Sequence, residues 1–198
     1  IGSGFACGGF CVQFGCDWTA FCYASIAAIL GNRLRMFLNH SGSNIYANFA
    51  VAAFVSTVLA WLSSFISTPS VQAALPEFLR PILFTHTPWH PLLACALYIV
   101  PGVPLINAVN DLLDNYINTG LIRSMNTMLI VVSMSFGIML AIKCGSFDGF
   151  AKDLSTIPDH PFYFYAIAAA ISAMGFATIY NIPYRLMPWI AVGGIICV

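Results

Sequence analysis

Long apolar stretches alternate with short polar connectors along this chain of 198 residues. A helix that crosses the hydrocarbon core of a bilayer needs about 20 mostly apolar residues. Five stretches meet this length, namely Thr19–Leu38, Ile45–Ile66, Pro91–Val109, Leu121–Ile142 and Phe162–Tyr180. Shorter apolar stretches, expected to be truncated spans, occupy both ends of the chain. The pattern predicts an all-α, polytopic transmembrane helix bundle of about seven membrane segments, five of them complete.

The polar connectors divide the chain into two membrane units. Two short connectors, at 14–18 and 39–44, are expected to form tight turns between neighbouring spans. A longer connector at 68–90 contains several prolines and is expected to lie at the surface. We predict a first membrane domain at residues 1–145, a polar connector at 146–160 and the start of a second membrane domain at 161–198. Because both ends of the chain lie inside apolar stretches, we expect a fragment of a longer protein.

The composition supports a membrane environment. Hydrophobic residues make up 60% of the chain and charged residues 7%, and the mean hydropathy is +0.86. Because a soluble domain has about 25% charged residues, the lipid bilayer is the expected partner. The formal net charge is zero, which argues against a nucleic-acid partner. The seven cysteines lack Cys-x-x-Cys spacing, so we expect free thiols in apolar surroundings and neither a metal nor another cofactor.

The basic residues indicate an orientation. When the spans alternate between the two sides of the membrane, Arg33, Arg35, Arg123 and Arg185 fall on the same side. This small excess of positive charge places that side in the cytoplasm. We predict a multi-pass protein of the plasma (inner) membrane.

A Pro-Gly-Val-Pro sequence at 101–104 interrupts the third complete span. In a discontinuous helix, carbonyls near Leu97–Val100 would lose their partners and could face a cation. The half-helix that begins near Pro104 would present a partly positive N-terminus to an anion. These two ends suit a zwitterionic amino acid, and the candidate substrate-binding residues are Pro101, Gly102, Pro104 and Asn107. The alternative is that the prolines only end a helix at the interface, before a solvated polar loop.

Two aspartates and an arginine follow this interruption. Asp111 and Asp114 are three residues apart, so they share a face of a helix. Two carboxylates this close repel each other, which favours proton uptake and makes both of them candidate proton-coupling residues. Arg123 follows a turn expected at 118–120 and is the candidate charge partner. The alternative is an interfacial helix end with an ordinary basic anchor.

A faint internal repeat relates the two ends of the chain. Gly9-Phe10 precedes the turn at Gly15–Trp18, and Gly175-Phe176, 166 residues later, precedes the turn at Ile182–Arg185. Five segments separate the two pairs, so a second copy would be inverted in the membrane, as in many secondary transporters. Because residue identity is minimal, chance similarity is the competing explanation.

Motifs near the interruption resemble those of the threonine/serine exporter family. Val100–Leu105, Asn110–Leu113 and Gly120–Arg123 are similar to that family's PG-x-x-L, R/N-D-L and G-L-x-R motifs. Phe14–Trp18 resembles its F-G-G-S-W turn, from which the third and fourth residues depart. Gly175–Arg185 resembles the opening of the family's second membrane domain.

The resemblance implies a nearly complete first membrane domain and a second one that has barely begun. It implies export of threonine or serine coupled to the proton-motive force, so the expected partners are a small amino acid and protons. A homo-oligomer, or pairing with the missing second membrane half, is also expected. We therefore predict a secondary transporter and no enzymatic activity.

Two other functions compete with this prediction. Asn110-Asp111-x-x-Asp114 resembles the first Asp-rich motif of membrane prenyltransferases, which binds Mg²⁺-diphosphate. Asn118 stands where that motif has its third Asp, and no second Asp-rich motif follows. The other alternative is a small-molecule channel or a non-transporting assembly subunit. A channel needs polar residues on several spans, whereas they are concentrated on one segment here.

Overall fold

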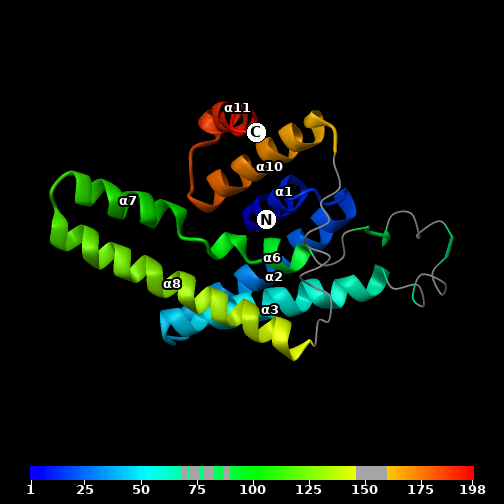
Figure 1. Cartoon of the computed structure of the whole chain (residues 1–198), viewed down its shortest axis with the longest axis horizontal. Helices are drawn as coiled ribbons and strands as arrows, with labels where there is room; N and C mark the ends of the chain where they lie inside the picture. The colour runs from blue at the N-terminus through cyan, green and yellow to red at the C-terminus, as the bar shows by residue number, and fades with distance from the viewer. Residues whose placement is uncertain (68–70, 72–75, 78–82, 87–89, 146–159) are drawn as a thin grey trace.

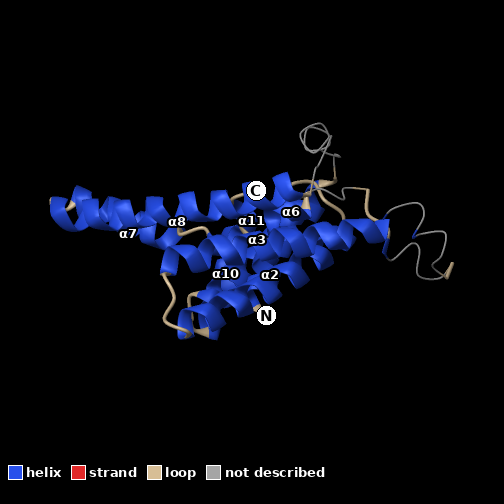
Figure 2. Ribbon diagram, turned by 90° about the horizontal axis from the view of Figure 1, so that it is seen from below, coloured by secondary structure: helices blue, strands red, loops and turns tan. Residues whose placement is uncertain are grey.

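The computed structural model describes residues 1–67, 71, 76–77, 83–86, 90–145 and 160–198. The regular elements in these ranges are all helices, which confirms the all-α class (Figure 1 and Figure 2). The α-helices are α1 (Gly2–Gln13), α2 (Trp18–His40), α3 (Ile45–Ser64), α6 (Pro91–Ala94), α7 (Gly102–Leu113), α8 (Ile117–Cys144), α10 (Phe162–Ile179) and α11 (Met187–Ile196). The 3-10 helices are η1 (Phe65–Ser67), η2 (Leu97–Ile99) and η3 (Tyr184–Leu186). The polar connector predicted at 146–160, apart from His160, lies outside the described residues, as does most of the connector at 68–90.

Helix lengths follow the lengths of the apolar stretches. Three of the described helices are long and apolar enough to cross a membrane, and these spans are Ile45–Ser63, Ile117–Cys144 and Phe162–Ile179. The 23 residues of α2 form the helix expected at Thr19–Leu38, but Arg33 and Arg35 make its last third polar. The third predicted span is divided into α6, η2 and α7. The structure thus has three candidate spans among its described residues, and the larger number stays a prediction.

The antiparallel helices α1 and α10 pack closely against each other at the centre of the structure (Figure 1). Gly9 on α1 faces Ser172, and Gly175 on α10 faces Ala6. A methyl group added to Gly175 would overlap the backbone nitrogen of Ala6, so this approach requires a glycine. Under the 166-residue offset of the sequence repeat, the first of these contacts maps onto the second.

Two further pairs of features are related by the same offset of 166 residues. Phe10 packs edge-on against Phe176, its counterpart, with 5.6 Å between the ring centroids. Gly15, two residues beyond α1, has a φ angle of 84°, and Asn181, two residues beyond α10, has one of 54°. Both helices therefore end through a left-handed residue at equivalent positions. This arrangement supports the inverted repeat expected from the sequence.

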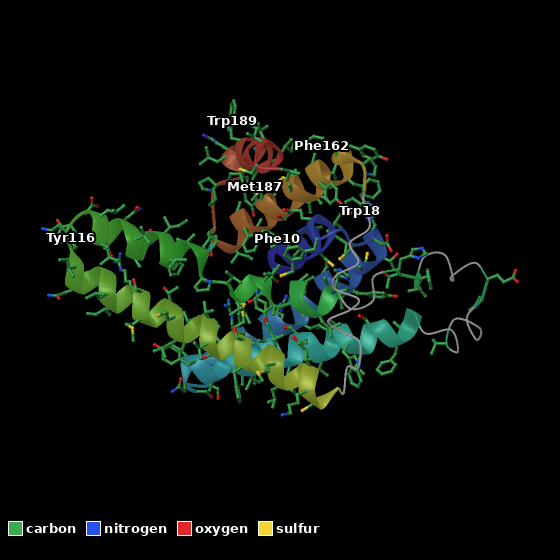
Figure 3. The ribbon with its side chains drawn as sticks, viewed as in Figure 1. Phe10, Trp18, Tyr116, Phe162, Met187 and Trp189 are labelled. Carbon is green, nitrogen blue, oxygen red and sulfur yellow. The ribbon has the colours of Figure 1, made fainter. Side chains whose placement is uncertain are left out.

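Helices α7 and α8 form a hairpin that extends beyond the other helices, with Tyr116 at its tip (Figure 1 and Figure 3). The turn is made by Asn115, whose φ angle is 65°, and by Tyr116, whose N–H donates to the Asp111 carbonyl over 2.8 Å. This is the left-handed Schellman ending, which asparagine tolerates. The turn predicted at 118–120 is therefore wrong, because α7 ends earlier and these residues open α8. A methyl group on Gly120 would lie 2.6 Å from the Leu112 side chain, so Gly120 lets the two helices approach.

The outer face of α8 is apolar, whereas its inner face packs on α3. A methyl group on Gly137 would overlap the Ala50 carbonyl, so the two helices meet without an intervening side chain. More than half of the surface of each of six outward-facing residues is exposed, and these are Ile122, Met125, Met128, Val132, Phe136 and Met139. Such a stripe is suited to lipid or to another membrane helix.

The turn at Asn115 allows a simple test. Replacing Asn115 by valine is expected to cost about 1 kcal/mol of stability, because a β-branched residue is strained in the left-handed conformation. Replacing it by glycine, which adopts this conformation freely, is expected to cost nothing. Thermal unfolding of the purified protein in detergent measures both changes. Equal stability of the two variants would contradict the assigned turn.

Candidate functional site

The predicted interruption of the third span is confirmed. Between α6 and α7 the chain forms η2 and then a three-residue turn centred on Pro101, in which the Gly102 N–H donates to the Val100 carbonyl over 2.9 Å. The Pro101 angles, φ −83° and ψ 60°, are those of an inverse γ-turn. The half-helix α7 begins at Gly102, so Pro104 occupies the first turn, where the N–H that it lacks would have no partner in the helix.

Backbone carbonyls at this interruption are less free than the sequence led us to expect. The Leu97 carbonyl accepts a hydrogen bond from the Val100 N–H over 3.1 Å, and the Val100 carbonyl accepts the bond from Gly102. The 3-10 helix and the γ-turn thus satisfy groups that a simple break would leave unpaired. The prediction of freed carbonyls is wrong at these two residues, and no cation site is built on them.

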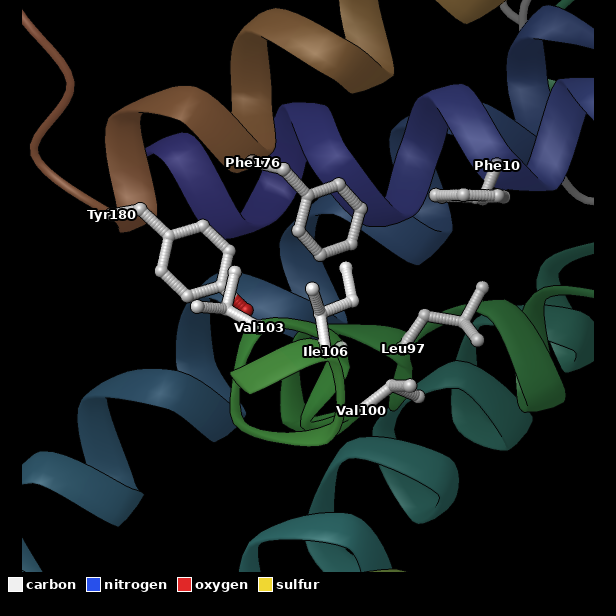
Figure 4. Close-up of a pocket in the computed structure, with 8 residues that line it drawn as sticks. Phe10, Leu97, Val100, Val103, Ile106, Phe176 and Tyr180 are labelled. Atoms are coloured by element: carbon white, nitrogen blue, oxygen red, sulfur yellow. The ribbon is translucent and has the colours of Figure 1, made fainter. Parts of the chain in front are cut away.

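A cavity of about 460 Å³ lies where the interrupted segment faces α1 and α10 (Figure 4). The residues that line it are Phe10, Leu97, Val100, Gly102, Val103, Ile106, Phe176 and Tyr180. Apart from the Tyr180 hydroxyl, their side chains are apolar. The cavity therefore accepts a hydrocarbon group more readily than a charged one.

The four candidate substrate-binding residues are not gathered in this cavity. Gly102 lines it. Pro101 is buried next to it in the chain, Pro104 is partly exposed, and Asn107 is exposed on α7. The cavity walls come from η2 and α7, which adjoin the Pro-Gly motif, and from α1 and α10, which lie far from it in the sequence. The binding roles of the four residues stay predictions.

Asp111 and Arg123 form an ion pair between α7 and α8. The Arg123 Nη1 donates to the Asp111 Oδ2 over 2.6 Å. The Arg123 side chain is 51% exposed and that of Asp111 is 21% exposed. Asp114 instead ends α7 as an exposed residue whose backbone N–H donates to the Asn110 carbonyl, and its side chain makes no hydrogen bond or ion pair with the described residues. The candidate charge partner thus contacts one of the two aspartates, and the coupling role of both stays a prediction.

Arg35 is a site residue that the sequence analysis treated only as a cytoplasmic flanking charge. Its guanidinium carbon lies 5.4 Å from the centre of the Phe49 ring and 5.6 Å from that of the Tyr98 ring. Nε of Arg35 is buried and has no hydrogen-bond partner. Arg33, two residues earlier, is exposed. Because they are two residues apart, the two arginines lie on different faces of α2. This spacing was the signal in the sequence that their surroundings differ.

Together, the interrupted helix, the cavity beside it and the helices long enough to cross a membrane indicate a class, that of polytopic membrane proteins. Residues 1–145 match the family model described as "Putative threonine/serine exporter" (ThrE), so the chain belongs to this family. This membership confirms the resemblance found in the sequence motifs. The family is one of transporters, so the prenyltransferase hypothesis is not retained.

Two curated relatives are named for another substrate. The chain is 30% identical over 148 residues to "Probable succinate transporter subunit YjjP" of Klebsiella aerogenes, an alignment that covers 75% of this chain and 52% of the relative. It is 28% identical over 139 residues to the protein of the same name from Escherichia coli strain K12. That alignment covers 70% of this chain and 48% of the relative. The chain thus spans about half the length of these relatives. No solved structure matches the chain.

Proposed function

We propose that this chain is part of a secondary transporter that exports small carboxylate-bearing metabolites across the plasma (inner) membrane by proton antiport. The observation that carries the proposal is the interrupted helix at 95–101, which lies beside a cavity between two antiparallel helices. Secondary transporters bind their substrates at such interruptions, at the interface of inverted repeats. The cavity here lies between the interrupted helix of the first repeat and the opening helix of the second.

Two kinds of substrate are candidates. Threonine and serine are the substrates in the family description, and succinate is the substrate in the names of the two relatives. All three compounds are small, and each carries at least one carboxylate. Gly102 at the cavity, with Pro101, Pro104 and Asn107 around it, is our proposed contact region for the substrate.

The transporter is proposed to need more membrane segments than this chain supplies. The two relatives are named subunits, and the chain spans about half of their length. A second membrane half, a partner subunit or a second copy would complete the inverted repeat that α10 and α11 begin. The exposed apolar stripe of α8 offers such a segment a surface within the bilayer.

The ion pair between Asp111 and Arg123 is our proposed proton-coupling element. Protonation of Asp111 removes the charge that holds Arg123, so it would loosen the contact between α7 and α8. Because α7 begins at the interruption, a shift of this helix would reach the cavity wall at Gly102 and Val103. Proton binding and substrate access would thus be linked through one helix. Asp114, three residues away, would adjust the charge near the pair.

The proposal is tested by transport into proteoliposomes that contain the full-length protein, with any subunit that co-purifies with it. Labelled threonine, serine and succinate are supplied with and without a pH gradient. We expect a gradient of one pH unit to raise the accumulation of at least one of them about tenfold, because it is worth about 1.4 kcal/mol for each exchanged proton. Protein-free vesicles and an uncoupler are the controls. Uptake of none of the three, or uptake that ignores the gradient, would contradict the proposal.

A further inference from the structure

A partly buried arginine packs between α2, α3 and η2 and has no counter-ion among the described residues. Arg35 is held between the rings of Phe49 and Tyr98, and its Nε is buried without a hydrogen-bond partner. No ion pair of Arg35 occurs among the residues that the structure describes. A cation in the interior of a membrane protein is costly unless it finds an anion, so such a residue indicates a functional site.

A second buried polar group without a partner lies one turn earlier on the same helix. Oδ1 of Asn32 is buried and accepts no hydrogen bond. Residues three apart on a helix are neighbours on its surface, so the Asn32 amide and the Arg35 guanidinium face the same region. An amide has both an acceptor and donors. Two unsatisfied polar groups side by side are suited to a ligand that carries an anion and a second polar group.

Neighbouring aromatic residues connect this pair to the cavity. Tyr98 directly follows Leu97, which lines the cavity. Arg35 in turn stacks on the Tyr98 ring, with 5.6 Å between the guanidinium carbon and the ring centre. The Tyr98 hydroxyl already shares a hydrogen bond of 3.1 Å with Ser56, which fixes the ring on which Arg35 stacks. The guanidinium therefore packs against a fixed ring, while its buried Nε has no hydrogen-bond partner.

We propose that Arg35 binds the carboxylate of the transported substrate, with Asn32 contacting the substrate's second polar group and the apolar cavity accepting its hydrocarbon part. This inference rests on the proposed function and names the recognition group within it. Guanidinium and carboxylate form paired, charge-assisted hydrogen bonds, which suit both an amino acid and a dicarboxylate. Asn32 would accept from the ammonium or hydroxyl group of threonine, or donate to the second carboxylate of succinate.

The test is equilibrium binding of labelled L-threonine and of labelled succinate to the full-length protein in lipid nanodiscs. Replacing Arg35 by glutamine is expected to weaken binding of the true substrate about 10- to 100-fold, as the loss of a charged hydrogen-bond partner does. Arg33→Gln is the matched control, because Arg33 is exposed on the same helix, and it is expected to bind within about twofold of the wild type. Whichever labelled compound binds to the wild type shows whether the substrate is the amino acid or the dicarboxylate.

A competition arm separates recognition from stability. The competitors that displace the bound label are L-threoninamide and succinamide, in which an uncharged amide replaces each carboxylate. The wild type is expected to prefer acid over amide by at least about tenfold, whereas Arg35→Gln should not distinguish them, because the preference comes from the guanidinium. Arg35→Lys keeps the charge without the planar fork, so it should keep the preference at a lower affinity.

Each outcome decides a different question. If the wild type binds and Arg35→Gln keeps the acid preference, the inference is overturned and the proposed function stands. If Arg35→Gln does not fold, Arg35→Lys decides, because wild-type affinity in that variant would also overturn the inference. If the folded wild type binds neither compound, the proposed substrates are wrong, and the inference about Arg35 is overturned as well.

Discussion

Replacing Gly175 by valine is expected to abolish the close packing of α1 against α10 and to leave little folded protein. The methyl group that any other residue adds here overlaps the backbone nitrogen of Ala6. A side chain can turn away from a clash, but the backbone of a packed helix cannot move without shifting the whole helix. Overpacking in a core costs about 1–3 kcal/mol and sometimes more, and we expect the upper end of that range because the contact is with backbone. The yield of monodisperse protein in detergent and its thermal unfolding measure the effect.

Gly193 supplies the matched control. It lies within α11, and a methyl group added there meets nothing within 4 Å. Gly193→Val is therefore expected to keep the wild-type yield and stability to within about 0.5 kcal/mol, as substitutions away from packed features do. Equal loss in both variants would show that helical glycines matter here for another reason than helix approach. If Gly175→Val were as stable as the wild type, the close approach of α1 and α10 at Gly175 would be wrong. The inverted repeat would then lose the pair of equivalent contacts that supports it.

The sequence predicted the described helices well because apolar length decides them. The bounds of α3 and α10 differ from the predicted stretches by at most two residues, since polar connectors adjoin both. The interruption at Pro101 was also predictable, because proline removes a backbone donor. The position of the hairpin turn was not predictable, because the segment from Asn107 to Asn118 contains four asparagines. Which of them takes the left-handed conformation depends on packing between α7 and α8.

Parts of the candidate site depend on contacts that sequence spacing does not reveal. The pairing of Arg123 with Asp111 could be anticipated, since the two residues flank one turn. The surroundings of Arg35 could not, because Phe49 is on α3 and Tyr98 on η2. The cavity likewise joins Phe10 to Phe176, which are distant in the chain. Local patterns thus predicted the elements and the interruption, whereas tertiary packing decides what faces them.

Asp111→Asn is expected to uncouple the transporter from the proton gradient. The amide keeps the size of the carboxylate but neither binds a proton nor attracts Arg123, so the stimulation of uptake by a pH gradient should fall at least about tenfold. Exchange of labelled for unlabelled substrate at equal pH should persist, because it needs no net proton movement. Proteoliposome assays with and without the gradient measure both quantities. Uptake that keeps its full dependence on the gradient would contradict the coupling role.

A charge exchange distinguishes coupling from simple stability. Arg123→Asp alone places two carboxylates where the ion pair is now, so it should destabilise the hairpin of α7 and α8. Combined with Asp111→Arg it restores an opposite pair and should recover the stability that the single change loses. The carboxylate then lies on α8 rather than on α7, so protonation no longer acts from the helix that begins at the cavity, and gradient-driven uptake should stay low. Recovery of coupled transport in the double variant would show that only the ion pair matters and that the position of Asp111 does not.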